Sequence, residues 1–361
     1  MITDLPPIDH ARRVAAMCGG ASGTTLYTDL ADMRWLTGFV GSNGWAVVRH
    51  DALIVGTDGR YGEKACEDTA GSGATVIVEH QAVALHERLV QVLGTGAVGL
   101  DSSSVSHAVW ERLANAVHLV HQPSPVSVLR RTKDEAEVAR IEAAAACADS
   151  ALAVVEPQLC GMTEADVRME LEYQLRLHGA DDRSYDTIVA AGPDHGARPH
   201  HAASGRTIIE GDTVTIDVGA LVDGYHSDMT RSWVMGEATE HQREIYELVS
   251  VAQQAGLDTI TPGVAARDVD ASCRQVFVDA GYGDWFIHGT GHGVGLDIHE
   301  SPYHSASSAE NILEGYVVTV EPGLYRGGFG GFRIEDLVLV TKPVNGTGHR
   351  VLTHSPKREL N

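Results

Sequence analysis

The chain has 361 residues, a length that suggests two domains, and 43% of its residues are hydrophobic while 21% are charged. This balance excludes a disordered chain, a collagen-like fibre and a coiled coil. The net charge of −22 argues against partners that attract basic proteins, namely nucleic acids and anionic membrane surfaces.

Cysteine usage and the N-terminal residues bear on the cellular compartment. The five cysteines are scattered and form no C-x-x-C pair, which is typical of reduced thiols in a cytoplasmic protein. The first residues contain acids and prolines without the apolar segment of a signal peptide. No apolar run reaches the roughly 18 residues of a membrane-spanning helix. The sequence therefore predicts a cytoplasmic protein with no membrane partner.

Short β-rich runs alternate with helical patterns over residues 1–125, which predicts an N-terminal α/β domain. The expected strands are 24–28, 45–50, 52–57, 74–80 and 97–101, and the expected helices include 85–93 and 105–117. The polar segment 121–125 contains two prolines and predicts a linker. The second domain is then expected to extend over residues 126–361.

A long helix is expected at the start of the second domain. Thr132 and Glu135 have the spacing of a capping box. Apolar residues then recur at steps of three and four as far as Val155, which indicates one buried helical face.

The second domain also contains an internal repeat. Residues 161–167 (GMTEADV) resemble 263–269 (GVAARDV), and the helix predicted after each segment ends near a glycine. Residues 210–219 (EGDTVTIDVG) match 314–323 (EGYVVTVEPG), at an offset of 104 against 102 for the first pair. Two α+β halves are therefore predicted, with the functional site between them.

The repeat aligns acidic residues in apolar strands. Asp217 of the first half falls on Glu321 of the second, and each half adds one more strand acid, Asp228 and Glu335. The turn signal 223–224 (DG) predicts a hairpin that would bring Asp217 and Asp228 side by side.

Four converging acids cannot all ionise in an apolar setting unless a cation neutralises them. The segment 288–299 (HGTGHGVGLDIH) offers histidine as a further donor. Four carboxylates and one imidazole suit two divalent ions. Hard oxygen donors favour Mn²⁺, with Co²⁺ and Zn²⁺ as alternatives. The glycines of this segment lack the G-x-G-x-x-G spacing of a nucleotide-binding loop, so no organic cofactor is expected.

Four segments of the second domain resemble the Xaa-Pro peptidase branch of the pita-bread metallopeptidases, which includes Xaa-Pro aminopeptidase and Xaa-Pro dipeptidase (prolidase). They are TIDVGALVDGYHSDMTRSW, HGTGHGVGLDIHESP, VVTVEPGLY and GGFRIEDLVLV. The resemblance covers nearly the whole chain. It implies a creatinase-like N-terminal α/β domain followed by an α+β pita-bread catalytic domain with pseudo-two-fold symmetry.

The resemblance also implies the site residues. The implied metal ligands are Asp217, Asp228, His292, Glu321 and Glu335. The implied catalytic and substrate-site residues are His200, His288, His299, Glu321 and Arg333.

The expected reaction is hydrolysis of the peptide bond before proline, with proline-containing peptides as partners. Glu321 would deliver a proton to the tertiary proline nitrogen, which leaves only when protonated. His299 or His288 would stabilise the oxyanion, and His200 would hold a substrate carbonyl or carboxylate.

Three functions compete. Xaa-Pro aminopeptidase is favoured because the segment 57–61 (TDGRY) is more similar to the aminopeptidases. Xaa-Pro dipeptidase is the alternative within the branch. A non-enzymatic pita-bread binding protein is the alternative of another class, and the complete ligand set argues against it. The resemblance further implies a homodimer. The remaining histidines of the second domain, among them His195, His201, His226 and His304, are expected to have structural or surface roles.

Overall fold

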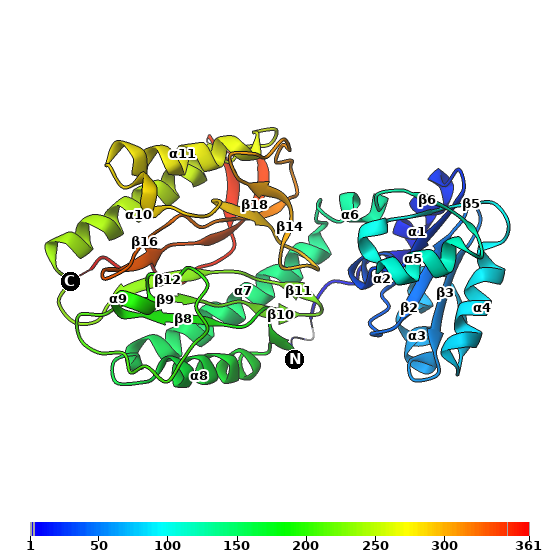
Figure 1. Cartoon of the computed structure of the whole chain (residues 1–361), viewed down its shortest axis with the longest axis horizontal. Coiled ribbons are helices and arrows are strands. Elements are labelled where there is room, and N and C mark those ends of the chain that lie inside the picture. The colour runs from blue at the N-terminus through cyan, green and yellow to red at the C-terminus, as the bar shows by residue number, and fades with distance from the viewer. Residues whose placement is uncertain (1, 3, 345, 361) are drawn as a thin grey trace. The chain divides into compact units, whose positions relative to one another are not determined.

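The computed structural model describes residues 2, 4–344 and 346–360, which divide into two compact units (Figure 1). The smaller unit comprises Pro7–Arg130, and the larger comprises Met1–Pro6 together with Arg131–Asn361. The sequence places the domain boundary earlier, at residue 125. The segment around that residue begins a short helix instead of a linker, because proline is well suited to the first position of a helix.

The smaller unit is built on a six-stranded mixed sheet in the order β4-β3-β2-β1-β5-β6. The strands are β1 (Thr24–Tyr27), β2 (Gly44–Val48), β3 (Leu53–Asp58), β4 (Thr75–Glu79), β5 (Ala97–Leu100) and β6 (His118–His121). The helices are α1 (His10–Gly20), α2 (Leu30–Thr37), α3 (Gly62–Thr69), α4 (Ala82–Leu93), α5 (His107–Ala114) and α6 (Pro125–Leu129). All five predicted strands are present. Strand β6 gave no signal in the sequence because most of its side chains are exposed and show no apolar alternation.

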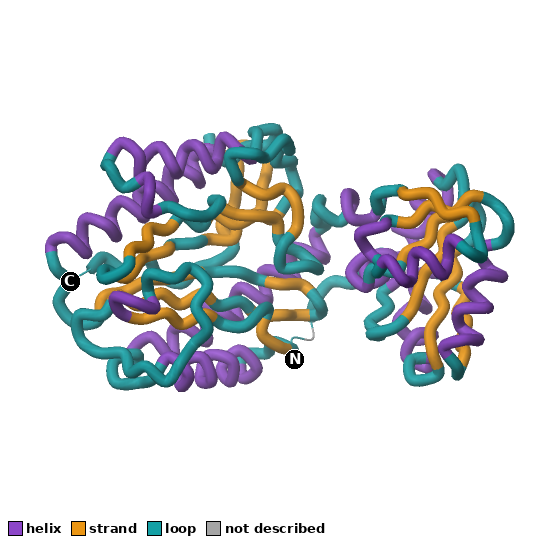
Figure 2. Tube along the Cα trace, in the orientation of Figure 1, coloured by secondary structure: helices purple, strands orange, loops and turns teal. Residues whose placement is uncertain are grey.

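In the larger unit, strands lie between two groups of helices (Figure 2). The helices are α7 (Glu135–Val155), α8 (Glu164–Leu177), α9 (Gly192–His195), α10 (Glu240–Thr259) and α11 (Ala266–Asp279). The strands of the first half are β7 (Asp182–Arg183), β8 (Ile188–Ala191), β9 (Thr213–Asp217), β10 (Ala220–Val222), β11 (Tyr225–His226) and β12 (Thr230–Val234). Those of the second half are β13 (Gly291–Gly293), β14 (Glu300–His304), β15 (Val317–Val320), β16 (Gly323–Arg326), β17 (Gly330–Arg333), β18 (Asp336–Val344) and β19 (Thr347–Val351).

The internal repeat is visible in the structure. Helices α8 and α11 each have 14 residues and begin 102 residues apart. Gly161 and Gly263 precede them with φ angles of 94° and 93°, a backbone conformation that favours glycine over residues with a side chain. Strands β9 and β15 occupy equivalent places in the sheets β12-β9-β8 and β14-β13-β15-β18-β19. Each half has its own apolar core, one beneath α7 and α8 and the other beneath α10 and α11.

Helix α7 begins later than predicted. Asp134 caps the helix and forms a capping box with Glu137, so the prediction of Thr132 and Glu135 is wrong. Thr132 is extended and pairs with Tyr316 in an isolated β-bridge, which removes it from the start of the helix.

The predicted hairpin also differs. Asp223 and Gly224 do form the turn, with φ angles of 45° and 75°, but they connect the short strands β10 and β11. Strand β9 pairs instead with β12, and its last residue, Asp217, lies opposite Thr230. Asp217 and Asp228 are therefore not partners across a ladder, because the chain inserts a second small hairpin between them.

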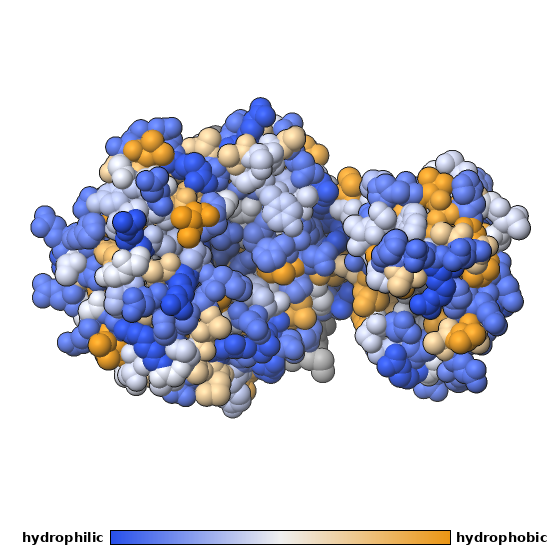
Figure 3. Space-filling view, in the orientation of Figure 1, coloured by the Kyte–Doolittle hydropathy of each residue, from blue (hydrophilic) through white to orange (hydrophobic). Residues whose placement is uncertain are grey.

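Hydrophilic side chains cover most of the visible face, and hydrophobic ones form small separate patches (Figure 3). Within the described residues, no helix combines the length and the apolar character needed to cross a membrane.

Candidate metal centre

The five predicted metal ligands surround one cavity of about 270 Å³ between the two halves of the larger unit. Asp217 ends β9, and Asp228 lies just before β12. His292 is the middle residue of β13, Glu321 follows β15, and Glu335 lies between β17 and β18. Each ligand is thus held at or beside a strand end, where the backbone is fixed by sheet hydrogen bonds.

The imidazole of His292 presents an unprotonated nitrogen to the carboxylates. Its Nδ1 atom lies 3.0 Å from the carbonyl oxygen of Gly293, which can only accept, so Nδ1 carries the proton of the neutral ring. Burial lowers the pKa of His292 and so favours this neutral form. Its Nε2 atom then faces Oδ2 of Asp228 and Oε1 of Glu321, each at 3.5 Å. Two carboxylate oxygens and one unprotonated imidazole nitrogen therefore lie close together here.

The carboxylates are crowded and buried. Asp228 is 5% exposed and Glu335 is 1% exposed. Burial, together with the neighbouring acids, raises the pKa of Asp228 and of Glu335 well above the ordinary range. Burial also raises the pKa of Glu321. Charged carboxylates are therefore unfavourable at this place unless a cation compensates them.

This donor set fits divalent cations. Asp228, His292 and Glu335 each offer a ligand atom, and these atoms all lie within 4.8 Å of one another. Glu321 and Asp217 line the same cavity. Carboxylate oxygens with one imidazole nitrogen are donors that Mn²⁺, Co²⁺ and Zn²⁺ accept. The unprotonated Nε2 of His292 and the buried, crowded carboxylates beside it are the two observations that support a divalent cation.

Most of the hydrogen-bond donors of Arg333 are used by protein groups. The side chain of Arg333 is 3% exposed. It donates from Nε to Thr230 Oγ1 at 2.9 Å, from Nη1 to Pro199 O at 3.1 Å and to Tyr325 Oη at 2.8 Å, and from Nη2 to Asp217 Oδ2 at 2.8 Å. The predicted site residue therefore lines the cavity, but most of its donors hold the surrounding structure.

His288 is held in a defined tautomer. Its Nδ1 atom lies 2.7 Å from the carbonyl oxygen of Gly289 and must carry the ring proton. Its Nε2 atom lies 3.1 Å from the hydroxyl of Tyr325, which must then donate to it. Burial lowers the pKa of His288, which favours this neutral ring. Both nitrogens are thus engaged by the protein.

His200 and His299 also line the cavity. Among the described residues, neither imidazole has a hydrogen-bonding partner. Burial lowers the pKa of His299, and neighbouring His292 and His200 lower it further. The His299 ring lies edge-on to the His292 ring, with centroids 4.4 Å apart. These two histidines keep their ring nitrogens available to a ligand.

Sequence reasoning missed three residues that orient the ligands. The hydroxyl of Tyr185 donates to Asp217 and also lies 2.5 Å from Oδ1 of Asp228. Thr230 donates to Oε2 of Glu335 at 2.8 Å, and Thr319 accepts from the backbone N–H of His292 at 3.1 Å. The two threonines lie in strands that the sequence did predict, but nothing in the sequence connects Tyr185 to acids 32 and 43 residues later.

The histidines without a predicted site role lie outside the cavity lining. His195 and His201 contact Glu164, and His226 contacts Ser184. His304 is completely buried in β14.

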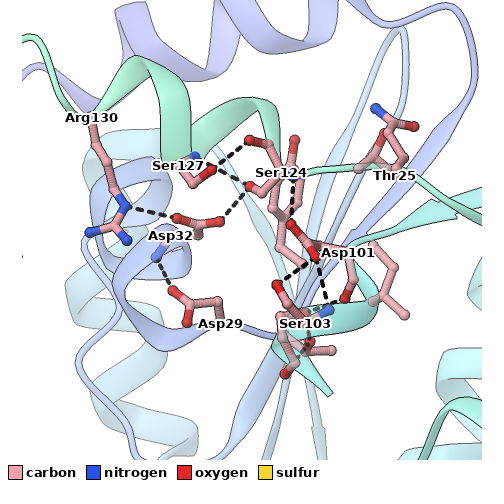
Figure 4. A pocket seen from close by; sticks show the side chains of 13 residues that line it. Thr25, Asp29, Asp32, Asp101, Ser103, Ser124, Ser127 and Arg130 are labelled. Carbon is pink, nitrogen blue, oxygen red and sulfur yellow. Dashed lines mark hydrogen bonds and ion pairs between the residues drawn. The ribbon is translucent and has the colours of Figure 1, made fainter. Parts of the chain in front are cut away.

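A second pocket, of about 180 Å³, lies in the smaller unit where β1, β5 and β6 end (Figure 4). Its polar groups bind one another. Asp32 pairs with Arg130 at 3.0 Å and accepts from Ser124 at 2.5 Å, while Asp101 accepts from Ser103 and from the backbone of Ser124. None of the predicted site residues belongs to this pocket.

Comparisons with known proteins agree with this geometry. Residues 139–342 match the model of metallopeptidase family M24, and residues 14–132 match the creatinase/prolidase N-terminal domain. The chain is 45% identical over 231 residues to an Xaa-Pro dipeptidase of Pyrococcus furiosus, over 64% of each chain. Its fold is similar to an Xaa-Pro dipeptidase from Bacillus anthracis, with a TM-score of 0.89, 33% identity and coverage of 97% of this chain and 98% of that one. It is also similar to an X-Pro aminopeptidase from Thermotoga maritima, with a TM-score of 0.87, 29% identity and coverage of 98% and 99%.

These matches confirm the predicted resemblance and the predicted fold, a creatinase-type N-terminal domain followed by a pita-bread domain. The chain belongs to the Xaa-Pro aminopeptidase and dipeptidase branch of metallopeptidase family M24.

Proposed function

We propose that this protein is an Xaa-Pro dipeptidase that uses two divalent metal ions. The observation that carries the hydrolytic function is that four carboxylates line one cavity, two of them 3.5 Å from the unprotonated Nε2 of His292. The names of the Pyrococcus furiosus relative and of the Bacillus anthracis structure support the dipeptidase as the substrate class. The aminopeptidase that the sequence favours is the second candidate, supported by the Thermotoga maritima structure.

The ligands of the proposed ions are Asp217, Asp228, His292, Glu321 and Glu335. Bound divalent ions supply Lewis acidity and an activated water at neutral pH. Mn²⁺ is the proposed metal because oxygen donors predominate. Glu321 borders the same cavity, and we assign its carboxylate the delivery of a proton to the departing proline nitrogen.

The histidines divide into two roles. His299 has a ring nitrogen free to donate, so we assign it the role of stabilising the oxyanion that develops on the scissile carbonyl. His288 lacks such a donor because both of its nitrogens bind Gly289 and Tyr325. We assign it to holding Tyr325 and, through it, Arg333.

The carboxylate of a dipeptide substrate needs a donor on the protein. Four donor contacts of Arg333 go to protein acceptors, so this arginine is not available for bidentate capture. His200 is exposed at the edge of the same cavity with its ring free, and we assign it to the substrate carboxylate.

The test is to offer Ala-Pro, Ala-Pro-Ala and Ala-Ala-Ala to the Mn²⁺-loaded protein and to identify the products by mass spectrometry. A dipeptidase releases alanine from Ala-Pro and leaves both tripeptides intact. Release of alanine from Ala-Pro-Ala, with little turnover of Ala-Pro, would establish the aminopeptidase instead. Rapid cleavage of Ala-Ala-Ala would remove the requirement for proline and contradict both candidates.

A homodimer and a cytoplasmic location remain part of the proposal on the grounds given for the sequence. Sedimentation of the purified protein checks the first of these.

A further inference from the structure

One buried acid of the larger unit has no part in the metal centre. Glu164 is the first residue of α8 and its side chain is completely buried. A buried carboxylate is costly unless hydrogen bonds satisfy it, so its partners indicate what it does. These partners all belong to one segment, residues 191–204, which connects β8 to the region before β9.

The carboxylate of Glu164 binds both ends of this segment. At the first end, Oε1 accepts from the backbone N–H of Ala191 at 2.9 Å and from Nδ1 of His195 at 2.9 Å. At the other end, Oε2 accepts from Nε2 of His201 at 3.2 Å and from Ser204, whose backbone N–H and hydroxyl lie at 3.1 and 2.6 Å. One side chain therefore closes a loop of about a dozen residues.

The contacts indicate an ionised carboxylate. Burial alone would raise the pKa of Glu164, but the hydrogen bonds from Ser204, Ala191 and His195 lower it below the ordinary value. Charge-assisted hydrogen bonds of this kind are stronger than neutral ones. A carboxylate that accepts from five donor groups on four residues holds the loop firmly.

The same three side chains could be read as a metal site, because Glu164, His195 and His201 offer ligand atoms within 4.8 Å of one another. The rings argue against it. His195 and His201 are stacked, with centroids 4.1 Å apart and planes 29° from parallel. The ring nitrogens that face Glu164, Nδ1 of His195 and Nε2 of His201, donate to its carboxylate, and a protonated nitrogen has no lone pair with which to bind an ion.

The loop closed in this way presents Pro199 and His200 to the cavity. The carbonyl of Pro199 accepts from Nη1 of Arg333 at 3.1 Å. The imidazole of His200 has no hydrogen bond to another described residue, so the backbone of the loop sets its position. Whatever fixes the two ends of the loop therefore also fixes where His200 can meet a substrate.

We infer that Glu164 is a positioning residue, which holds His200 at the cavity by tying both ends of the loop 191–204 to the start of α8. This inference rests on the proposed function, in which His200 binds the peptide. The repeat gives it a further basis. The equivalent position of the second half is Ala266, so the tether is not required to begin the equivalent helix α11.

The experiment is a double-mutant cycle on hydrolysis of Ala-Pro by the metal-loaded full chain. Glu164→Gln keeps the shape of the side chain but removes the charge and one acceptor oxygen. We expect kcat/KM to fall about 10- to 100-fold, the order of effect that displacement of a substrate-binding group produces. In a His200→Ala background the same change should cost less than about twofold, because the group that Glu164 positions is already absent. Ser204→Ala removes only the hydroxyl contact to Glu164. It should lower kcat/KM by a smaller factor, and this loss should likewise disappear in the His200→Ala background.

The matched control is Glu170→Gln on the same helix, whose carboxylate accepts from Gln174 one turn later. It should leave kcat/KM unchanged. The inference is overturned if Glu164→Gln costs the same factor with and without His200, if His200→Ala has no effect, or if the Glu170 control behaves like Glu164→Gln.

Hydrogen–deuterium exchange provides a readout that does not depend on the substrate. Residues 196–203 should exchange faster in Glu164→Gln than in the wild type, while β9 and β15 and the bound metal per chain stay the same. Unchanged exchange over 196–203 would contradict the tether. If the wild type cleaves no Xaa-Pro peptide, the proposed function fails, but the exchange result still decides whether Glu164 holds the loop.

Discussion

Nη2 of Arg333 donates to Oδ2 of Asp217 at 2.8 Å, which makes this arginine the direct neighbour of a metal-ligand candidate. We expect Arg333→Lys to lower kcat/KM for Ala-Pro by roughly 100-fold, because one ammonium cannot reach four acceptors that a planar guanidinium spans. Steady-state kinetics with Ala-Pro and with Ala-Pro-amide check this. If Arg333 acts on Asp217, both substrates lose the same factor. A loss confined to the free carboxylate would show that Arg333 binds the substrate instead.

Removal of metal should reveal repulsion among the acids. The pKa of Asp228 is raised above its unfolded value, so ionisation of Asp228 at pH 8 destabilises the metal-free folded chain. Asp228→Asn should therefore raise the melting temperature of the metal-free protein, by about 2–4 °C for each kcal/mol of relief. With saturating Mn²⁺ the variant should instead melt at a lower temperature than the wild type, because it has lost a candidate metal ligand. Differential scanning fluorimetry with and without a chelator measures both. Asp258→Asn, at an exposed position of α10, is the control and should show no reversal.

His299 should matter for the rate and not for the metal. Its ring lies edge-on to that of His292 and lines the cavity. We expect His299→Ala to lower kcat by about 10²–10³-fold, the loss typical of one oxyanion donor. Metal content, measured by mass spectrometry of the purified variant, should remain at the wild-type value. A loss of metal in this variant would make His299 a ligand and contradict the assignment.

His304 should make the larger unit sensitive to acid. It is completely buried, and burial lowers its pKa from 6.5 to about 3. The unfolded chain binds a proton below pH 6.5 that the folded chain does not, so stability is present above that pH and is lost as the pH falls toward 3. Replacing the ring should remove this dependence.

Urea unfolding at pH 7.5 and 5.0 measures the effect. The change in the free energy of unfolding caused by His304→Leu should be more favourable to the variant at pH 5.0 than at pH 7.5 by about 2 kcal/mol. This is the free energy that the wild type loses when the pH lies 1.5 units below the pKa of the unfolded histidine. His354→Leu, at an exposed position, should show no such difference. Equal effects of His304→Leu at the two pH values would mean that this histidine is protonated in the folded chain.

The sequence predicted which residues line the candidate metal cavity better than it predicted their arrangement. Asp217 and Glu321 were detectable because an acid in an apolar strand breaks a pattern that is repeated 104 residues later. The elements of the smaller unit were detectable wherever one face of a strand is buried. Strand β6 was not, since little of it is buried.

The rest depended on contacts between distant residues. Strand register decided that Asp217 faces Thr230 and not Asp228, and the inserted hairpin that causes this is set by tertiary pairing with β7. The roles of Arg333 and His288 followed from which acceptors and donors lie beside them, which no spacing in the sequence reveals. Tyr185 was missed for the same reason, because it reaches both aspartates across the fold.

The division of ligands between the two halves has a consequence for ancestry. Asp217 and Glu321 occupy equivalent places at the ends of β9 and β15, and each half contributes only part of the donor set. A protein made of one half of the larger unit could enclose comparable metal ions only by pairing with a second copy across a two-fold axis. The internal repeat is the arrangement that duplication and joining of such a pair would produce. Among the five candidate ligands the only histidine is His292 of the second half, so the two halves no longer contribute equally to the site.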